Sequence, residues 1–386
     1  MSDAIQAKIQ DIDEEIARTQ VNKRTMSHLC LLRSRRAELT RQMMQLSKKS
    51  GGGQFDGFSI QKTGKPRISL VGSPSVGKSS LMNIFMGDEE FSEVNERQFT
   101  TLTAIPGTVD LGEDIPTKGA GATKVQIVDL PGIIDGAIQL NRGGGRQILS
   151  TARTSDLVLI LLDGTRPWGE KKMIERELHQ FGIRLNKKPK HIIVRKLSSG
   201  GIRYRSTCRL TKISKEEVES ACKQFKFNSV DILFREDANM EDLLDALHNT
   251  QSPGFIVYIP CVYALNKIDM LSLQEVNLWN KFENMCPISV KQGWNIDELK
   301  EMMWERLDLI RVYTKPRSSD PDFEDPVILR RDKSTVEDFC MKIHKTLAQN
   351  MRYAWVWGRS VKFSPGRAGL SHNLADEDVV HIVAKI

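Results

Sequence analysis

The stretch Gly72-Ser-Pro-Ser-Val-Gly-Lys-Ser79 decides the fold of this 386-residue chain. It fits the pattern G-x-x-x-x-G-K-[ST], follows directly after the apolar run Ile68–Val71, and precedes a helix that is predicted to begin at Lys78. A buried strand, a glycine-containing loop and a helix in this order close backbone N–H groups around phosphates at the helix N-terminus. The sequence therefore predicts a nucleotide-binding α/β fold.

Two side chains at the end of this stretch have predicted roles of their own. Lys78 is expected to reach the β- and γ-phosphates, and the Ser79 hydroxyl is expected to bind Mg²⁺. The predicted phosphate-binding residues are Gly72, Ser75, Val76, Gly77, Lys78, Ser79 and Ser80.

Two further motifs are predicted to complete the phosphate and metal site. Val128-Asp-Leu-Pro-Gly132 ends the next apolar strand, so that Asp129 can join the Mg²⁺ shell and the Gly132 N–H can sense the γ-phosphate. Phe99-Thr-Thr-Leu102 lies on a polar segment suited to a switch loop, where Thr101 would be a third ligand. The predicted catalytic residues are Thr101, Asp129 and Gly132, and the predicted metal ligands are Ser79, Thr101 and Asp129.

A fourth motif, Asn266-Lys-Ile-Asp269, selects the base. Guanine offers N1–H and N2–H₂ donors to a carboxylate, whereas adenine has an acceptor at N1 and no amino group at C2. Asp269 therefore favours GTP and GDP over ATP, Lys267 is predicted to flank the purine, and Ser289-Val290-Lys291 is predicted to complete the pocket.

The residue after the Asp-Leu-Pro-Gly motif is unusual for a GTPase. Ras-like enzymes usually have a glutamine there that orients the attacking water, but this chain has Ile133. An isoleucine side chain cannot donate or accept a hydrogen bond. Either the protein does not hydrolyse nucleotide, or other groups position the water.

The rest of the chain suggests a parallel sheet covered by helices and flanked by smaller parts. Further strands are expected at Val125–Asp129, Leu157–Asp163 and Val257–Asn266, with helices near Met173–Phe181 and from Asn295. An N-terminal helical hairpin precedes a glycine-rich linker. A ββαβ module is inserted, with strands at His191–Arg195, Ile202–Arg209 and Val230–Phe234 and a helix capped by Ser214 and Glu217.

The C-terminal pattern suggests a β-grasp fold. It comprises strands at Ile310–Thr314, Val327–Arg330, Tyr353–Trp357 and Val379–Val383, with a helix capped by Ser334 and Glu337. The predicted domains are an N-terminal helix–turn–helix at 1–50, a GTPase domain at 51–170 and 248–308, an insert at 171–247 and a β-grasp domain at 309–386.

Charge is concentrated in one part of the chain. The segment from Glu170 to Lys215 holds fourteen Lys and Arg residues against three Glu, a surplus of +11 that exceeds the net charge of +7 for the whole chain. Such a segment attracts polyanions, most commonly nucleic acid, although it can also be a solvated face. The favoured RNA-contacting residues are Arg195, Arg203, Arg205 and Arg209.

Other compositional features narrow the class. The six cysteines are scattered without metal-ligand spacing, which predicts free thiols and a cytoplasmic protein. No lipidation motif or long apolar run is present, so no membrane anchor is expected. Trp355 and Trp357 share one face of their predicted strand, where a place in the core is favoured over base stacking.

Together these motifs resemble the developmentally regulated GTP-binding proteins of the Obg group, and are closer to the second of the two eukaryotic paralogues. The resemblance extends from IARTQVNKRT (16–25) through VDILFRED (230–237) to TVEDFCMKIHKTLAQNMRYAWVWGRSVKFSPGRAGL (335–370). It implies an S5-domain-2-like insert and a C-terminal TGS domain of ubiquitin-like β-grasp form.

The resemblance also implies a role. Its members are expected to be slow, ribosome-associated GTPases that act in translation with a small regulatory partner protein, and are otherwise monomeric. Related enzymes with an apolar residue at the position of Ile133 use K⁺ beside the phosphates, although Ser75 replaces the asparagine that holds the ion in many of them. The ribosome would offer rRNA or tRNA as the polyanion.

Two other classes remain open from the sequence. The protein could be a GTP-stabilised scaffold whose turnover is incidental. A membrane-trafficking GTPase is the third possibility, since basic patches also bind anionic lipids.

Overall fold

The computed structural model describes residues 65–87, 105–110, 124–130, 151–316 and 319–384, and scattered residues between 8 and 39. The chain forms two compact units. One comprises residues 1–56, 135–144 and 175–259, and the other comprises residues 57–134, 145–174 and 260–386.

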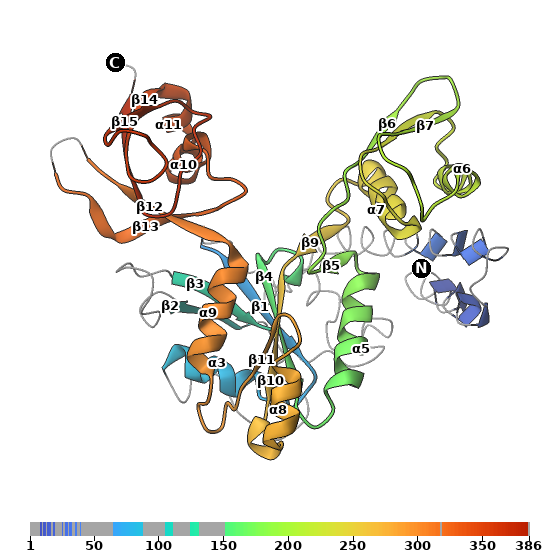
Figure 1. The fold of residues 1–386 in the computed structure, drawn as a ribbon, viewed down its shortest axis with the longest axis horizontal. Helices are drawn as coiled ribbons and strands as arrows, with labels where there is room; N and C mark the ends of the chain where they lie inside the picture. Colours follow the sequence, from blue (N-terminus) through green and yellow to red (C-terminus); the bar gives the residue numbers. More distant parts are fainter. Residues whose placement is uncertain are drawn as a thin grey trace, which may run out of the picture. The chain divides into compact units, whose positions relative to one another are not determined.

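A six-stranded sheet is the centre of the second unit (Figure 1). Its order is β11-β10-β4-β1-β3-β2, and every neighbouring pair is parallel except β2 with β3. The strands are β1 (Arg67–Gly72), β2 (Ile105–Asp110), β3 (Lys124–Asp129), β4 (Leu157–Asp163), β10 (Cys261–Asn266) and β11 (Met285–Pro287).

The central strands of this sheet are buried on both faces. All six residues of β1 are buried, as are the first six of β4. Strand β4 therefore reads as a continuous apolar run, whereas β1 also buries the polar side chains of Arg67 and Ser69. Helices α3 (Lys78–Met86) and α9 (Ile296–Leu307) contribute Leu81, Phe85, Leu299 and Met303 to a common core with the sheet. Helix α5 (Pro167–Gln180) follows β4, a 3₁₀ turn (Ile268–Met270) follows β10, and α8 (Leu273–Trp279) precedes β11.

Two strands differ from the sequence prediction. The predicted strand Val257–Asn266 is two strands in different sheets, β9 (Val257–Ile259) and β10, because Pro260 between them has no N–H for a sheet hydrogen bond. Strand β2 was not predicted at all. It lies at the sheet edge and contains Pro106 and Gly107, which are both depleted in strands.

The inserted ββαβ module is confirmed. Its sheet has the order β6-β8-β7, from β6 (Ile192–Lys196), β7 (Ile202–Ser206) and β8 (Val230–Phe234), with α6 (Lys215–Gln224) between β7 and β8. Ser214 and Glu217 form the predicted capping box of α6. Strand β7 ends at Ser206 rather than Arg209, and a second helix that was not predicted, α7 (Met240–Gln251), follows β8 with a box formed by Asn239 and Asp242.

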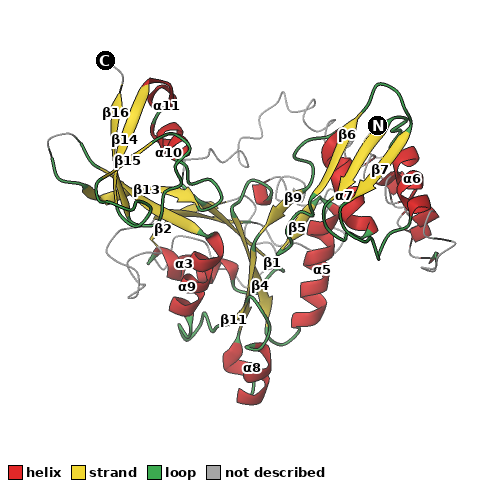
Figure 2. Cartoon of the chain, turned by 45° about the horizontal axis from the view of Figure 1, so that its top comes forward, coloured by secondary structure: helices red, strands yellow, loops and turns green. Residues whose placement is uncertain are grey.

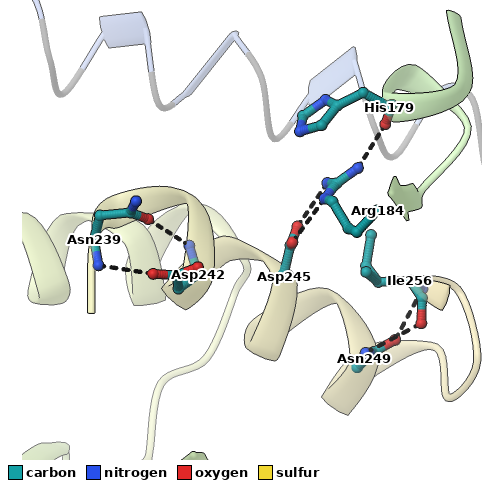
Figure 3. A network of polar contacts seen from close by, with 7 residues as sticks. All are labelled: His179, Arg184, Asn239, Asp242, Asp245, Asn249 and Ile256. Atoms are coloured by element: carbon teal, nitrogen blue, oxygen red, sulfur yellow. Dashed lines mark hydrogen bonds and ion pairs between the residues drawn. The ribbon is translucent and has the colours of Figure 1, made fainter. Parts of the chain in front are cut away.

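A buried ion pair attaches α7 to the short strand β5 (Ile183–Leu185), which pairs with β9 (Figure 3). The Arg184 Nε and Nη2 atoms donate to Asp245 Oδ2 and Oδ1 at 2.8 and 2.7 Å, and Nη1 donates to the His179 carbonyl at 2.7 Å. Both charged side chains are only 9% exposed. Burial and the Arg184 charge lower the pKa of His179 to about 4.

The C-terminal β-grasp fold is also confirmed (Figure 2). Its sheet has the order β13-β12-β16-β14-β15, with β12 and β16 parallel in the middle. The elements are β12 (Leu309–Thr314), β13 (Asp322–Arg330), α10 (Val336–Ile343), α11 (Lys345–Asn350), β14 (Met351–Trp357), β15 (Gly366–Ala368) and β16 (Asp378–Ala384). Val336 and Phe339 of α10 pack with Ala354 and Val356 of β14 in one core.

The predicted cap of α10 was wrong by one residue. Thr335 and Asp338 form the capping box, not Ser334 and Glu337. The backbone explains the difference, because the Ser334 carbonyl accepts from the Leu374 N–H and the Glu337 N–H donates to the Leu370 carbonyl. The Glu337 N–H, which the predicted box needs as the donor to the Ser334 hydroxyl, is therefore already used by the loop before β16, and the same loop also holds the Ser334 carbonyl.

The described residues between 8 and 39 are mostly helical, as the N-terminal spacing predicted. Ile9, Ile12, Leu29 and Leu32 are buried among them, and His28 Nε2 lies 2.9 Å from Glu15 Oε1. Across the described part of the chain, no helix has both the length and the apolar character that a bilayer span requires.

Candidate nucleotide-binding site

The loop between β1 and α3 has the backbone shape that its motif predicts. Ser75 and Gly77 have positive φ angles of 62° and 97°, and Gly77 is the N-cap of α3. The Lys78 Nζ atom donates to the carbonyls of Gly72 and Ser73 at 3.2 and 2.7 Å. The lysine thus folds back over its own loop and holds it in shape around the helix N-terminus.

Two glycines of this loop are required by close approach. A Cβ atom on Gly77 would lie 2.7 Å from Asn266 Nδ2, and one on Gly72 would lie 2.6 Å from the Leu161 carbonyl oxygen of β4. Real Cβ atoms do not approach that closely, so each glycine lets a neighbouring strand end meet the loop. Gly77 is doubly constrained, since its φ also favours glycine.

Lys78 is buried, and burial lowers its pKa below the usual value. The carboxylates of Asp129 and Glu170 act in the opposite direction. A buried cation between two carboxylates lies at the helix N-terminus, where phosphate oxygens are also favoured. The loop is therefore electrostatically suited to an anionic ligand.

Ser79 and Asp129 come together as predicted, from α3 and from the end of β3. The Ser79 hydroxyl donates to Asp129 Oδ2 at 3.3 Å, and Asp129 is fully buried. A hydroxyl and a carboxylate are oxygen donors of the kind that Mg²⁺ prefers, so this pair fits the ion. Thr101, Gly132 and Ile133 lie outside the described residues.

One amide joins the phosphate loop to the base-selecting segments. Asn266 Nδ2 donates to the Val76 carbonyl at 2.8 Å, and Asn266 Oδ1 accepts from the Val290 N–H at 3.0 Å. Asn266 is buried, so both hydrogen bonds are shielded from water. The loop 289–291 is thus adjacent to the Asn266 motif, as its order in the chain predicted.

Asp269 and Lys267 also have partners. The Ser289 hydroxyl donates to Asp269 Oδ1 at 2.7 Å, which orients an otherwise exposed carboxylate. Lys267 has a φ of 66°, and its Nζ donates to Asp163 Oδ2 at 2.6 Å. Asp269 is held ready to accept, and Lys267 is fixed in direction by an ion pair. Lys291 is exposed, and the structure gives it no contact with those predicted site residues that it describes.

Asp163 was missed by the sequence prediction. It ends β4, and its carboxylate also accepts from the Thr165 N–H and hydroxyl at 2.9 and 2.8 Å. Burial raises the pKa of Asp163, but the hydrogen bonds from Lys267 and Thr165 outweigh burial and leave the pKa lowered. The sequence feature that could have identified Asp163 is its position at the carboxyl end of a central parallel strand, where ligand sites of α/β sheets form.

Glu170 in the first turn of α5 was also missed. Its Oε2 atom accepts from the Asp163 N–H at 3.1 Å. Burial raises its pKa, and the nearby Asp163 carboxylate also raises it. The two acids therefore form a connected pair beside Lys78 and Lys267.

The arginines of the insert occupy a second candidate surface. Arg195, Arg203 and Arg205 are exposed, whereas Val194, Ile202 and Tyr204 pack against the core of the insert. Arg195 and Arg203 are both paired in register with Asp231 of β8, and Arg205 Nη2 lies 2.6 Å from Asp231 Oδ2. Three cations thus surround one carboxylate on the open face of a sheet. Arg209 is exposed in the loop after β7.

Sequence comparison adds three domain matches. A profile described as a 50S ribosome-binding GTPase matches residues 67–196, one described as the C-terminal region of that domain matches residues 199–309, and a TGS domain profile matches residues 310–384. The last match agrees with the β-grasp fold of the C-terminal sheet.

The chain is also similar over its full length to several known proteins. It is 46% identical to Developmentally-regulated G-protein 3 of Arabidopsis thaliana, covering 99% of both chains. It is 46% identical to Ribosome-interacting GTPase 1 of Saccharomyces cerevisiae, covering 98% of both. A crystal structure of a GTP-binding protein from Pyrococcus horikoshii aligns with 82% of this chain and 99% of its own, at a TM-score of 0.41 and 14% identity.

Proposed function

Because this chain belongs to the developmentally regulated GTP-binding protein family and is a GTPase, we propose that its GTP cycle controls an association with the ribosome. The observation that carries the proposal is the open sheet face of the insert, with Arg195, Arg203 and Arg205 around a single carboxylate. A relative that is 46% identical over 98% of both chains is named for ribosome interaction. rRNA or tRNA supplies the polyanion that such a face attracts.

We assign the nucleotide contacts to the residues already placed. Backbone N–H groups between Gly72 and Ser80 and the Lys78 ammonium hold the phosphates, and Asp269 reads guanine while Asn266 joins the two regions. Ser79 and Asp129 would hold Mg²⁺, with Thr101 as the third ligand. The ion would neutralise charge on the β- and γ-phosphates.

Hydrolysis in this proposal does not use the side chain at position 133. Ile133→Ala should keep most of the intrinsic rate, since isoleucine cannot orient water, and Gly132 would act through its backbone. K⁺ in place of Na⁺ should raise the rate if an ion sits beside the phosphates. If the rate does not respond to K⁺, the ion site is absent, and we would attribute its absence to Ser75, which replaces the usual asparagine. The Ser75 side chain is exposed and its φ is 62°.

The test is ribosome sedimentation with GTP, GDP and a non-hydrolysable analogue. Reversing Arg203, Arg205 and Arg209 to Glu should weaken co-sedimentation and make it less salt dependent, because fewer counterions are released. GTP binding should be unchanged. The matched control is Lys281→Glu, Arg306→Glu and Lys333→Glu, which changes net charge equally at exposed positions outside the insert.

Co-sedimentation of the insert variant over the same salt range as wild type would refute this role for the insert. A GTPase rate that does not change when ribosomes are added would instead favour the scaffold class, in which GTP only stabilises the binding shape. A small regulatory protein, expected for the family, would be a separate partner, and its effect is measured by adding it to the same assay.

A further inference from the structure

The C-terminal sheet has one covered face and one open face. Helices α10 and α11 lie on one side of it (Figure 2), and Val336, Phe339 and Cys340 of α10 share a core with the inward residues Ala354 and Val356. Side chains alternate along a strand, so the residues between these point to the other face.

Three aromatic side chains form a row on the open face. Tyr353, Trp355 and Trp357 are half-buried and occupy every second position of β14. The rings of Tyr353 and Trp355 meet edge to face with centroids 5.7 Å apart. The two tryptophans were expected in the core, but the core of this domain takes their neighbours Ala354 and Val356 instead.

Cations flank the aromatic row. Arg367 of β15 is in register with Trp355, and its guanidinium lies 4.2 Å from the centroid of the Tyr353 ring. The Lys315 Nζ atom lies 5.9 Å from the centroid of the Trp357 ring at the other end. Among the described residues, the outward positions of β14, β15 and β16 include no carboxylate; beyond the aromatic row they are Arg367, Val379, His381 and Val383.

We infer that this open face, defined by Tyr353, Trp355, Trp357 and Arg367, binds single-stranded RNA. Rings in a row at the two-residue spacing of a strand offer successive stacking surfaces, and flanking cations can contact the phosphates between stacked bases. A protein helix could also cover the rings, but it would need carboxylates placed opposite Arg367 and Lys315, whereas an RNA strand carries a phosphate at every nucleotide. Unpaired bases supply both a π-face and a charge.

This surface is separate from the arginine face of the insert, and the inference goes beyond the proposed function. A ribosome could be held by the insert without any base stacking on the C-terminal domain. Equally, the C-terminal domain could bind an unpaired RNA strand that is not ribosomal. The experiment must therefore measure RNA binding by the C-terminal face separately from RNA binding by the arginine face of the insert.

The test uses full-length protein, a fluorescein-labelled twelve-nucleotide poly(U) RNA and fluorescence anisotropy. The protein carries Arg203→Glu, Arg205→Glu and Arg209→Glu throughout, so that the insert does not contribute. Trp355→Leu and Trp357→Leu should each weaken binding about 5- to 150-fold, the range for loss of one stacked base. Trp355→Phe should retain most of the affinity, because phenylalanine still presents a ring.

Two controls make the result specific. Trp168→Leu removes a tryptophan that is 47% exposed in the same unit but not on this face, and should leave RNA binding unchanged. A duplex RNA of the same length should bind more weakly than the single strand, because its bases are already stacked on one another and cannot stack on the protein's rings. GTP binding and the melting temperature confirm that each variant is folded.

The inference would be overturned if the protein with both Trp355→Leu and Trp357→Leu bound the RNA as tightly as the protein with the unchanged C-terminal face. A protein partner would then be the candidate occupant of this face. Absence of any RNA binding in the insert-reversed background would overturn it as well. Ring-dependent binding would support it even if the sedimentation assay showed no ribosome association, so the two proposals can fail separately.

Discussion

At the scale of single residues, the nucleotide site depends on backbone positions as much as on charged side chains. The two glycines at the ends of α3 illustrate this. Gly77 and Gly87 both have positive φ, at 97° and 70°. A Cβ atom on Gly77 would meet Asn266, whereas one on Gly87 would meet none of the residues that the structure describes within 4 Å. Comparing them separates the cost of backbone strain from the cost of a collision.

Gly77→Ala should reduce GTP affinity at least 100-fold, because the new Cβ would displace the Asn266 amide that joins the loop to the base pocket. Gly87→Ala should cost about 1–2 kcal/mol of folding free energy through its left-handed backbone and leave GTP affinity unchanged. Calorimetric titration with GTP and thermal unfolding measure both. Equal affinities for the two variants would show that the collision is relieved by local movement.

Asp163 and Asp269 should have separable effects on nucleotide binding. Asp163→Asn removes the charge that fixes Lys267, so GTP and GDP affinity should both fall about tenfold while discrimination against ATP is kept. Asp269→Asn should weaken discrimination, because the carboxylate that accepts from guanine is lost. Competition binding with GTP, GDP and ATP is the measurement. Unchanged discrimination in the Asp269 variant would exclude it from the base pocket.

At the scale of elements, the buried Arg184–Asp245 pair is the main polar attachment of α7 that the structure describes (Figure 3). Asp245→Asn would leave a guanidinium that is 9% exposed without its charged partner, which costs about 3–5 kcal/mol of folding free energy. Asp308→Asn is the control, since the Arg331–Asp308 pair is more than 60% exposed and should contribute under about 1 kcal/mol.

Urea unfolding followed by circular dichroism compares these two variants. Similar midpoints for Asp245→Asn and Asp308→Asn would mean that the hydrogen bond that Arg184 already donates to the His179 carbonyl at 2.7 Å, together with the neutral amide at position 245, is enough to hold the guanidinium.

The elements also show how far sequence patterns reach. The strand–loop–helix of the phosphate site was predictable because its motif fixes backbone geometry locally, and the Ser214 box of α6 followed from side chains three residues apart. The cap of α10 was not, because two overlapping boxes fit the sequence and a distant loop, through Leu370 and Leu374, decides between them. The role of Asp163 was not predicted for a similar reason, because its partner Lys267 is distant in the sequence and is brought next to it by the pairing of β4 with β10.

At the scale of the whole molecule, three of the cores each contain a buried cysteine. Cys286 lies in the GTPase core, Cys222 in the insert core and Cys340 in the β-grasp core. Burial raises the pKa of Cys222 to about 11 and that of Cys286 to about 12, so neither thiol is reactive in the folded protein near neutral pH. Each thiol therefore reports the opening of its own core.

GTP should protect these thiols unequally. At 100 times its dissociation constant it stabilises the binding-competent fold by about 2.7 kcal/mol, which should slow alkylation of Cys286 about 100-fold and leave Cys222 nearly unaffected. The measurement is timed labelling with iodoacetamide in mild urea, followed by peptide mass spectrometry, which gives the alkylation rate of each cysteine. Uniform protection of both cysteines would mean that insert and GTPase core unfold as one cooperative block.

The single amide of Asn266, which holds the Val76 carbonyl with one end and the Val290 N–H with the other, has a consequence for selectivity. Guanosine and inorganic pyrophosphate supplied together carry nearly every chemical group of a guanine nucleotide, yet as separate molecules each would contact only one of the two segments that Asn266 joins. Because Asn266 ties the phosphate loop to the base-selecting loop, the covalently joined nucleotide should bind far more tightly than the product of its fragments' affinities, and free phosphates in a cell should compete poorly for the loop.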